Sequence, residues 1–242
     1  MTNTLHRRGS LEKLQSDYVI FAGTAKGVNR KQAAAKLQEF ARICLKHRPA
    51  NIGCSKQGNV LQEKFDVDTF ITKIEDGHRV NAVFTDLAAL QAVVEELARA
   101  DLGLCIVISG LLDGAQSCCH KAGIERHSVE SSLGFWGATD RLPEREILEL
   151  NTLCGHGMVS FNFVRKMIEQ VKLRRLTPKA AARMLGKCCE CGVFNPARAE
   201  QMLEQILEKG GTFSQPGLFT KEPWIIRAYL NQKNAISPDS SP

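Results

Sequence analysis

The sequence has few aromatic residues and no long hydrophobic run. Only 6% of its 242 residues are Phe, Trp or Tyr, and no stretch approaches the roughly 18 apolar residues that a membrane-spanning helix needs. The first residues contain no apolar segment of the kind that forms a secretory leader. We therefore expect a cytoplasmic protein with no membrane partner.

A disulfide framework is also not expected. The chain has nine cysteines, an odd number, and disulfides are rare in a reducing cytosol. Clustered thiols in that compartment more often bind metal or take part in chemistry. Four of the nine lie in the last 92 residues, where they flank a basic stretch, and they are Cys154, Cys188, Cys189 and Cys191.

The excess positive charge is confined to one part of the chain. Residues 1–150 carry 19 basic and 19 acidic residues, whereas residues 151–242 carry 13 and 7. Within residues 165–187 eight basic residues are accompanied by one acidic residue, Glu169. No aromatic residue lies among these cations and no RNA-reading or zinc-finger motif is present. We therefore expect a solvated helical face and no nucleic-acid partner.

The first part of the chain alternates between strand and helix patterns. This alternation predicts an α/β layer domain over residues 15–142, with a short sheet that is mostly parallel or ferredoxin-like. Asp86 is expected to cap one of its helices. The expected strands are residues 18–22, 78–85, 102–109 and 128–135, and the expected helices follow at about 30–47, 87–100 and 110–123.

After residue 142 the pattern becomes purely helical. We expect a smaller, all-helical, cysteine-rich metal-binding domain over residues 143–211, with a flexible N-terminus at 1–14 and a partly disordered extension at 212–242. Its expected helices are residues 143–150, 162–175, 177–187 and 196–209, with Thr177 as a cap and Pro178 and Pro196 in first turns.

The cysteines precede two helices whose first residues resemble each other. Phe-Asn-x-x-Arg occurs at 161–165 and again at 194–198, a spacing of 33 residues. Asn162 and Asn195 suit the N-cap position, so each cysteine turn should lie at the positive end of a helix dipole. A helix N-terminus favours the thiolate, which is the form that binds metal.

Two kinds of metal centre fit these residues. A [4Fe–4S] cluster would use Cys154, Cys191 and one or both of Cys188 and Cys189, and the spare thiols and nearby cations favour it. Zinc would use Cys154, His156, Cys188 and Cys191. Against the cluster, the common C-x-x-C-x-x-C run is absent. The remaining alternative is that these cysteines are small buried residues at helix ends.

Five further residues could act on a substrate. His127 and Glu130 could supply acid–base catalysis, and Lys26 lies in a glycine loop that could hold an anion. Arg165 and Arg198 are equivalent in the repeat and could hold an anionic substrate near the metal.

Together these residues predict a metalloenzyme of the lyase or hydrolase type. Its iron–sulfur cluster would act on a small anionic metabolite, with His156 as an acid–base group or fourth ligand. One alternative is a zinc-dependent hydrolase that uses the same cysteines. Another is a non-catalytic structural-zinc module with a basic docking surface. A homo-oligomer is compatible with all three.

Overall fold

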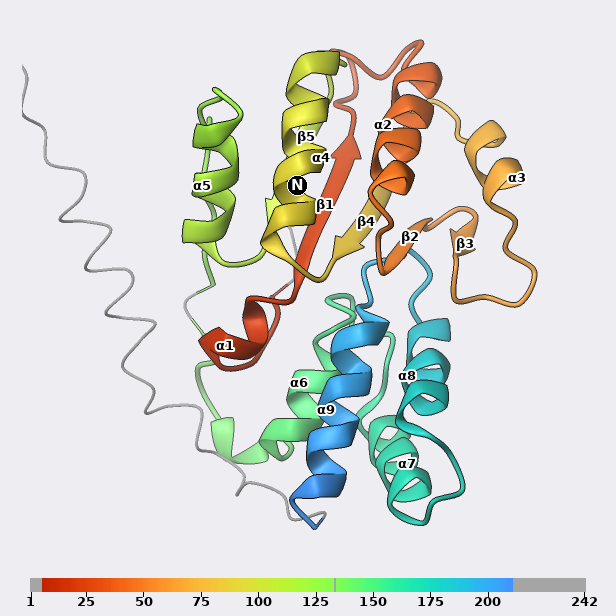
Figure 1. Ribbon diagram of the computed structural model, residues 1–242, viewed down its shortest axis with the longest axis vertical. Coiled ribbons are helices and arrows are strands. Elements are labelled where there is room, and N and C mark those ends of the chain that lie inside the picture. Colours follow the sequence, from red (N-terminus) through yellow and green to blue (C-terminus); the bar gives the residue numbers. More distant parts are fainter. Residues whose placement is uncertain (1–5, 133, 211–242) are drawn as a thin grey trace, which may run out of the picture.

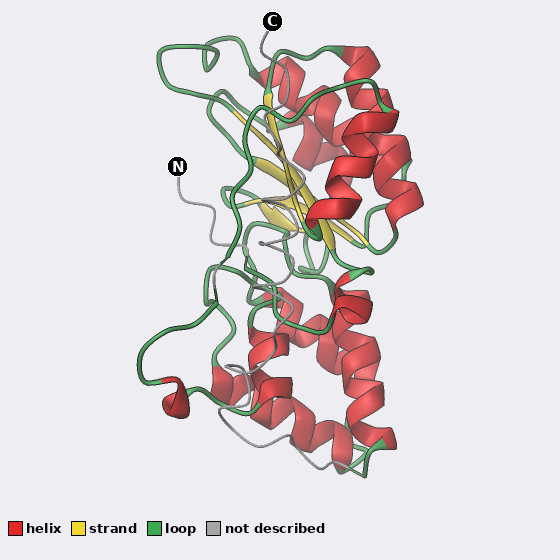
Figure 2. Cartoon of the chain, turned by 90° about the vertical axis from the view of Figure 1, so that its left-hand side faces the viewer, coloured by secondary structure: helices red, strands yellow, loops and turns green. Residues whose placement is uncertain are grey.

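The computed structural model describes residues 6–132 and 134–210 as a mixed α/β structure (Figures 1 and 2). In chain order its elements are α1 (Leu11–Leu14), β1 (Tyr18–Gly23), α2 (Ala34–Lys46), β2 (Asn51–Cys54), β3 (Gly58–Asn59), α3 (Val67–Thr72), β4 (Val80–Phe84), α4 (Leu87–Ala100), β5 (Cys105–Ser109), α5 (Leu112–Lys121), the 3₁₀ helix η1 (Thr139–Arg141), α6 (Arg145–Asn151), α7 (Phe161–Lys172), α8 (Pro178–Lys187) and α9 (Pro196–Glu208).

The sheet is antiparallel, so the expectation of a mostly parallel sheet is wrong. Its strand order is β3-β2-β4-β1-β5, and β1 pairs antiparallel with both β4 and β5. The helix α2 carries the chain from β1 to β2, but β4 lies between these two strands. The strands β1 and β2 run in the same direction, and β4 runs between them in the opposite direction. The pair β2 and β3 is also antiparallel, and the arrangement is of the split βαβ kind.

The two faces of the sheet pack against different parts of the chain. Side chains alternate along a strand, so Tyr18, Ile20 and Ala22 of β1 face α2 and α4, whereas Val19 and Phe21 face the opposite way. Val19 and Phe21 belong to the same hydrophobic cluster as buried residues of α6, α7, α8 and α9. The helical segment therefore shares a core with the sheet, and Figure 2 shows it below the sheet with α2–α5 to one side.

Several helix ends follow the sequence closely. Asp86, Thr177 and Asn195 each accept a hydrogen bond from a first-turn N–H group, as their residue types predict. Asn162 does not cap α7. Ser160 does so instead, by accepting from the Phe163 N–H at 3.2 Å.

Other parts of the chain differ from expectation. The described residues of segment 128–135 form a loop and not a strand, while α1, β2, β3 and α3 were not expected. Residues 6–14 are held against the body by Arg7, Arg8 and Lys13, so this part of the N-terminus is not free. The expected extension at 212–242 lies outside the described residues. Within residues 6–132 and 134–210, no helix combines the length and apolar character needed to cross a membrane.

Candidate metal centre

Three buried cysteines and one exposed histidine come together between α6 and α9. The Sγ atoms of Cys189 and Cys191 are 3.9 Å apart, and Cys191 Sγ lies 3.5 Å from His156 Nδ1. Cys154 joins them through a side-chain hydrogen bond with Cys189. The cysteines are at most 8% exposed, whereas His156 lies at the surface.

The first of the two loops follows α6 directly. The Cys154 N–H donates to Asn151 O at 3.2 Å, and the Gly157 N–H donates to Cys154 O at 3.1 Å. The Asn151 side chain donates to Val159 O and closes the loop. Gly157 has a φ of +71°, a conformation that glycine adopts without steric cost.

Three asparagine side chains hold the second loop, residues 188–195, against the sheet. Asn81 Nδ2 in β4 donates to Cys191 O and Asn51 Nδ2 in β2 donates to Phe194 O, each at 2.9 Å. Asn59 Nδ2 in β3 donates to Cys189 O. All three asparagines are buried. They satisfy backbone carbonyls that would otherwise be buried without a partner.

The second loop also approaches the sheet backbone very closely at Gly192. Its φ is +85°, and a Cβ there would overlap the backbone of Gly53 and Ile52. Both features require glycine. The cysteine loop therefore rests directly on β2.

We expect Gly192→Ala to lower the free energy of unfolding by about 2 to 4 kcal/mol, since it combines an unfavourable φ with an overlap against fixed backbone. Gly27→Ala is the matched control, because Gly27 has a φ of +81° but nothing within 4 Å of its Cβ position. Urea unfolding of both variants measures the difference. Equal losses would show that the loop does not rest on β2.

The centre is rich in donors to sulfur. Hydrogen bonds from the Cys154 and Cys191 thiols, and then from backbone N–H groups, lower the pKa of Cys189 against the opposing effect of burial. The same side-chain hydrogen bonds, together with burial, raise the pKa of Cys154 and of Cys191. The backbone donors to the three sulfurs are the N–H groups of His156, Met158, Gly192, Val193 and Phe194. N–H donors of this kind stabilise thiolates.

Cys188 does not belong to this centre. It ends α8, is partly exposed, and its Sγ lies 4.0 Å from Met184 O in the preceding turn. The zinc ligand set expected from the sequence named Cys188, but it is the Cys189 side chain that lies beside Cys154 and Cys191. Adjacent residues at the end of a helix point in different directions, so only one of the pair reaches the centre.

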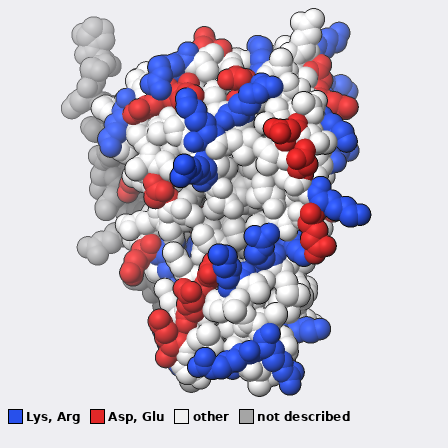
Figure 3. Space-filling view, turned by 45° about the vertical axis from the view of Figure 1, so that its right-hand side comes forward, with Lys and Arg blue, Asp and Glu red and all other residues white. Residues whose placement is uncertain are grey.

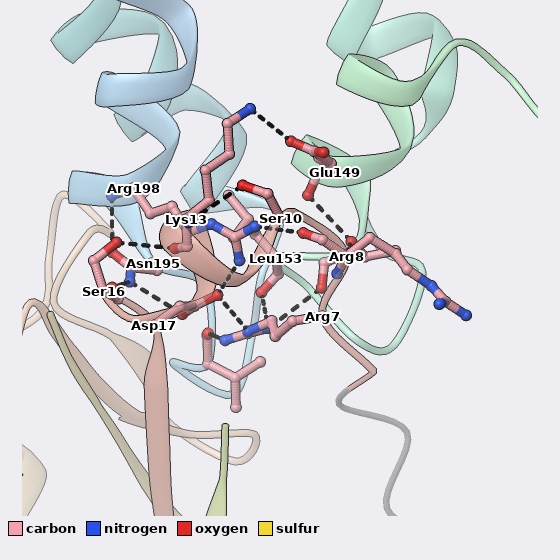
Figure 4. Close-up of polar contacts among 12 residues, drawn as sticks. Arg7, Arg8, Ser10, Lys13, Ser16, Asp17, Glu149, Leu153, Asn195 and Arg198 are labelled. Carbon is pink, nitrogen blue, oxygen red and sulfur yellow. Dashed lines mark hydrogen bonds and ion pairs between the residues drawn. The ribbon is translucent and has the colours of Figure 1, made fainter. Parts of the chain in front are cut away.

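A buried ionic network joins both loops to the N-terminal segment (Figure 4). The Arg7 side chain is 4% exposed, and its Nε lies 3.0 Å from Asp17 Oδ2. Its guanidinium donates to Leu153 O, next to Cys154, and to Val193 O, two residues after Cys191. One arginine therefore fixes the backbone of both cysteine loops.

Arg198 completes the same network. Its Nη1 lies 2.5 Å from Asp17 Oδ2, and the Asn195 side chain donates to Asp17 Oδ1 at 3.0 Å. Arg198 is 2% exposed. This placement gives Arg198 a structural ion pair and does not support the expected contact with a substrate.

The structure brings none of the other expected substrate residues to the cysteines. Arg165 is exposed and pairs with Glu144 at 3.0 Å, so it is not equivalent to buried Arg198. His127 and Glu130 are exposed in the loop after α5, where His127 Nδ1 lies 2.9 Å from Ser128 Oγ. Lys26 is exposed in the loop between β1 and α2.

The residues that position the cysteines were not singled out from the sequence. Asn51 and Asn59 occur in short segments with no clear pattern, and Arg7 lies in a segment expected to be flexible. One signal was available: Asn81 interrupts an otherwise apolar strand, and a polar residue at such a position must find a buried partner.

No group of three or more His, Cys, Asp or Glu side chains in the described ranges has the arrangement of a formed metal-ion site. No protein-family model, curated protein or solved structure matches this chain.

Proposed function

We propose that the chain binds one divalent ion of the zinc type through Cys154, His156, Cys189 and Cys191, and that the ion joins the two loops. The spacing of the ligand atoms carries this proposal. With Zn–S bonds of about 2.3 Å and Zn–N bonds of about 2.0 Å, neighbouring ligand atoms of a tetrahedral site are about 3.8 Å (S to S) and 3.5 Å (S to N) apart. The separations here are 3.9 and 3.5 Å.

The spacing favours a single ion over the iron–sulfur cluster expected from the sequence. Cysteines of a [4Fe–4S] cluster bind different irons, so their sulfurs are held farther apart than two sulfurs on one ion. Cys189 and Cys191 are too close together for that arrangement without movement of the loop.

Closing the centre around an ion requires a small rearrangement. Since the side chains do not yet form a metal-ion geometry, at least one must rotate. His156 is the side chain best able to do so, because it is exposed and lies between Gly155 and Gly157. The three cysteines are already buried and hydrogen-bonded.

A structural role is favoured over a catalytic one. One shallow pocket, of about 390 Å³, lies against α4 and α5 and is lined by Glu95, Arg99 and Lys121 among others. A second, lined by Gln62, Glu63, Lys64 and Lys187, is also open. Neither is lined by a cysteine of the centre. The lyase or hydrolase reaction on an anionic metabolite stays a prediction.

Metal analysis of the full chain, purified without oxygen, tests the proposal. We expect a colourless protein with one zinc per chain, and a lower melting temperature after a chelator removes the ion, because binding energy of a structural metal is folding energy. Substitution with cobalt should give the absorption of a tetrahedral thiolate site. Iron with labile sulfide would overturn the single-ion assignment, and a chain with no metal affinity would overturn the centre itself.

A further inference from the structure

The helices α7 and α8 and the turn between them carry a set of exposed cations. Figure 3 shows Lys and Arg side chains gathered along the lower edge of the molecule, where the helical half lies. We call five of these exposed cations the basic surface, and they are Lys166, Arg174, Arg175, Lys179 and Arg183.

In the part of the chain that the structure describes, these five cations differ from Arg165 and Lys187 in having no acidic partner. Arg165 pairs with Glu144 at 3.0 Å, and Lys187 pairs with Glu63 at 2.5 Å. Among the described residues, no ion pair is found for any member of the basic surface. Their charge is therefore directed at solvent and is available to an anion.

Arg174, in the turn between α7 and α8, has an unusual backbone conformation. Arg174 has a φ of +54°, in the left-handed region that favours glycine after a helix. The turn is held by N–H groups of Arg175 and Leu176, which donate to Gln170 O at 2.9 and 3.2 Å. A cation is thus present at a position where the backbone alone would favour glycine.

The helix faces limit what this surface can bind. The apolar sides of α7 and α8 are buried in the core, including Val164, Ile168, Ala181 and Leu185. Neither helix has a free apolar face to insert into lipid. The exposed large apolar side chains of α7, α8 and the turn between them are Phe161, Leu173 and Met184, too few for the apolar centre of a protein interface.

We propose that the basic surface binds the phosphate backbone of duplex nucleic acid. Phosphate contacts require only correctly spaced cations, and Lys179 and Arg183 repeat along α8 at about 6 Å. Base stacking is not part of the proposal, since no aromatic residue lies among these cations. The charge pattern alone favours a solvated face. The absence of acidic partners for these five among residues 6–132 and 134–210 favours a binding surface.

Fluorescence anisotropy of the full chain with labelled duplex DNA and duplex RNA tests this. We expect micromolar binding without sequence preference, with log K falling by about 0.9 per contacted phosphate for each unit of log salt. A variant carrying Arg174→Glu, Arg175→Glu, Lys179→Glu and Arg183→Glu should bind at least about tenfold more weakly. The slope of its log K against log salt should be smaller in magnitude by about 3 to 4. Comparing DNA with RNA shows which duplex geometry is preferred.

A pair of glycine variants separates binding from folding. Arg174→Gly should weaken duplex binding while leaving the melting temperature unchanged or higher, because glycine suits its φ. Arg48→Gly is the matched control: Arg48 is exposed, has a φ of +52° and follows α2, away from the basic surface, so its duplex binding should stay unchanged.

Three outcomes would overturn the proposal. They are equal binding by wild type and the four-residue variant, tighter binding to polyglutamate than to either duplex, and tighter binding to anionic lipid vesicles. Each is measured on protein with an unchanged metal content, so the result does not depend on the metal centre.

Discussion

Replacing Cys189 with serine is expected to weaken zinc binding by at least about a hundredfold, whereas replacing the adjacent Cys188 should leave it unchanged. Loss of a residue that only hydrogen-bonds to a metal ligand lowers metal affinity by about 10- to 100-fold. Loss of a thiolate that binds the metal itself should lower the affinity further. Only Cys189 has its sulfur near Cys154 and Cys191. Competition against a chromophoric chelator measures both affinities.

The two variants form a close control for each other. Both remove one thiol from the same turn and differ by one position, so a general effect of the substitution would appear in both. An equal loss in Cys188→Ser and Cys189→Ser would contradict the assignment of ligands. A loss confined to Cys188→Ser would restore the ligand set expected from the sequence.

We expect Asp17→Asn to lower the free energy of unfolding by about 3 to 5 kcal/mol, the usual cost of breaking a buried ion pair. Asp17 is fully buried, and its carboxylate contacts Arg7 at 3.0 Å and Arg198 at 2.5 Å. Asparagine keeps the shape but leaves both arginines without their shared counter-charge. Urea unfolding at saturating zinc isolates this effect from metal loss.

Glu39→Gln provides the comparison for the loss of a carboxylate. Glu39 pairs with Arg42 at 3.3 Å on the surface of α2, and both side chains are about half exposed. The expected change is under about 1 kcal/mol, since solvent screens exposed pairs. If Asp17→Asn were no more destabilising than Glu39→Gln, the buried network would not hold the N-terminal segment in place.

The sequence predicted those elements that have a strong local pattern. The helix α9 begins at Pro196 after the Asn195 cap, and α4 follows the Asp86 cap, as expected. Four ligand candidates of the centre were among the residues named from the sequence. In each case the information lies in a cap, an apolar repeat or a cluster of cysteines within a few residues.

Features that depend on distant residues could not be predicted in this way. Whether neighbouring strands are parallel or antiparallel depends on β4 lying between β1 and β2, and no local pattern specifies that strand order. The choice between Cys188 and Cys189 depends on the direction in which α8 ends. The apparent repeat at 161–165 and 194–198 failed because Ser160 caps α7, which shifts Arg165 to the surface while Arg198 is buried.

The contacts that hold the cysteine loop have a consequence for synthesis of the chain. Asn59 and Cys189 are 130 residues apart, Asn51 and Phe194 are 143 apart, and Arg7 and Val193 are 186 apart. Contacts of such long range form late in folding. The strands and Arg7 leave the ribosome well before the second loop does. Until that loop is synthesised, their side-chain donors lack the carbonyl groups that accept from them in the folded protein. We therefore expect that a nascent chain ending before residue 189 cannot hold its metal, and that loading follows translation of nearly the whole described region.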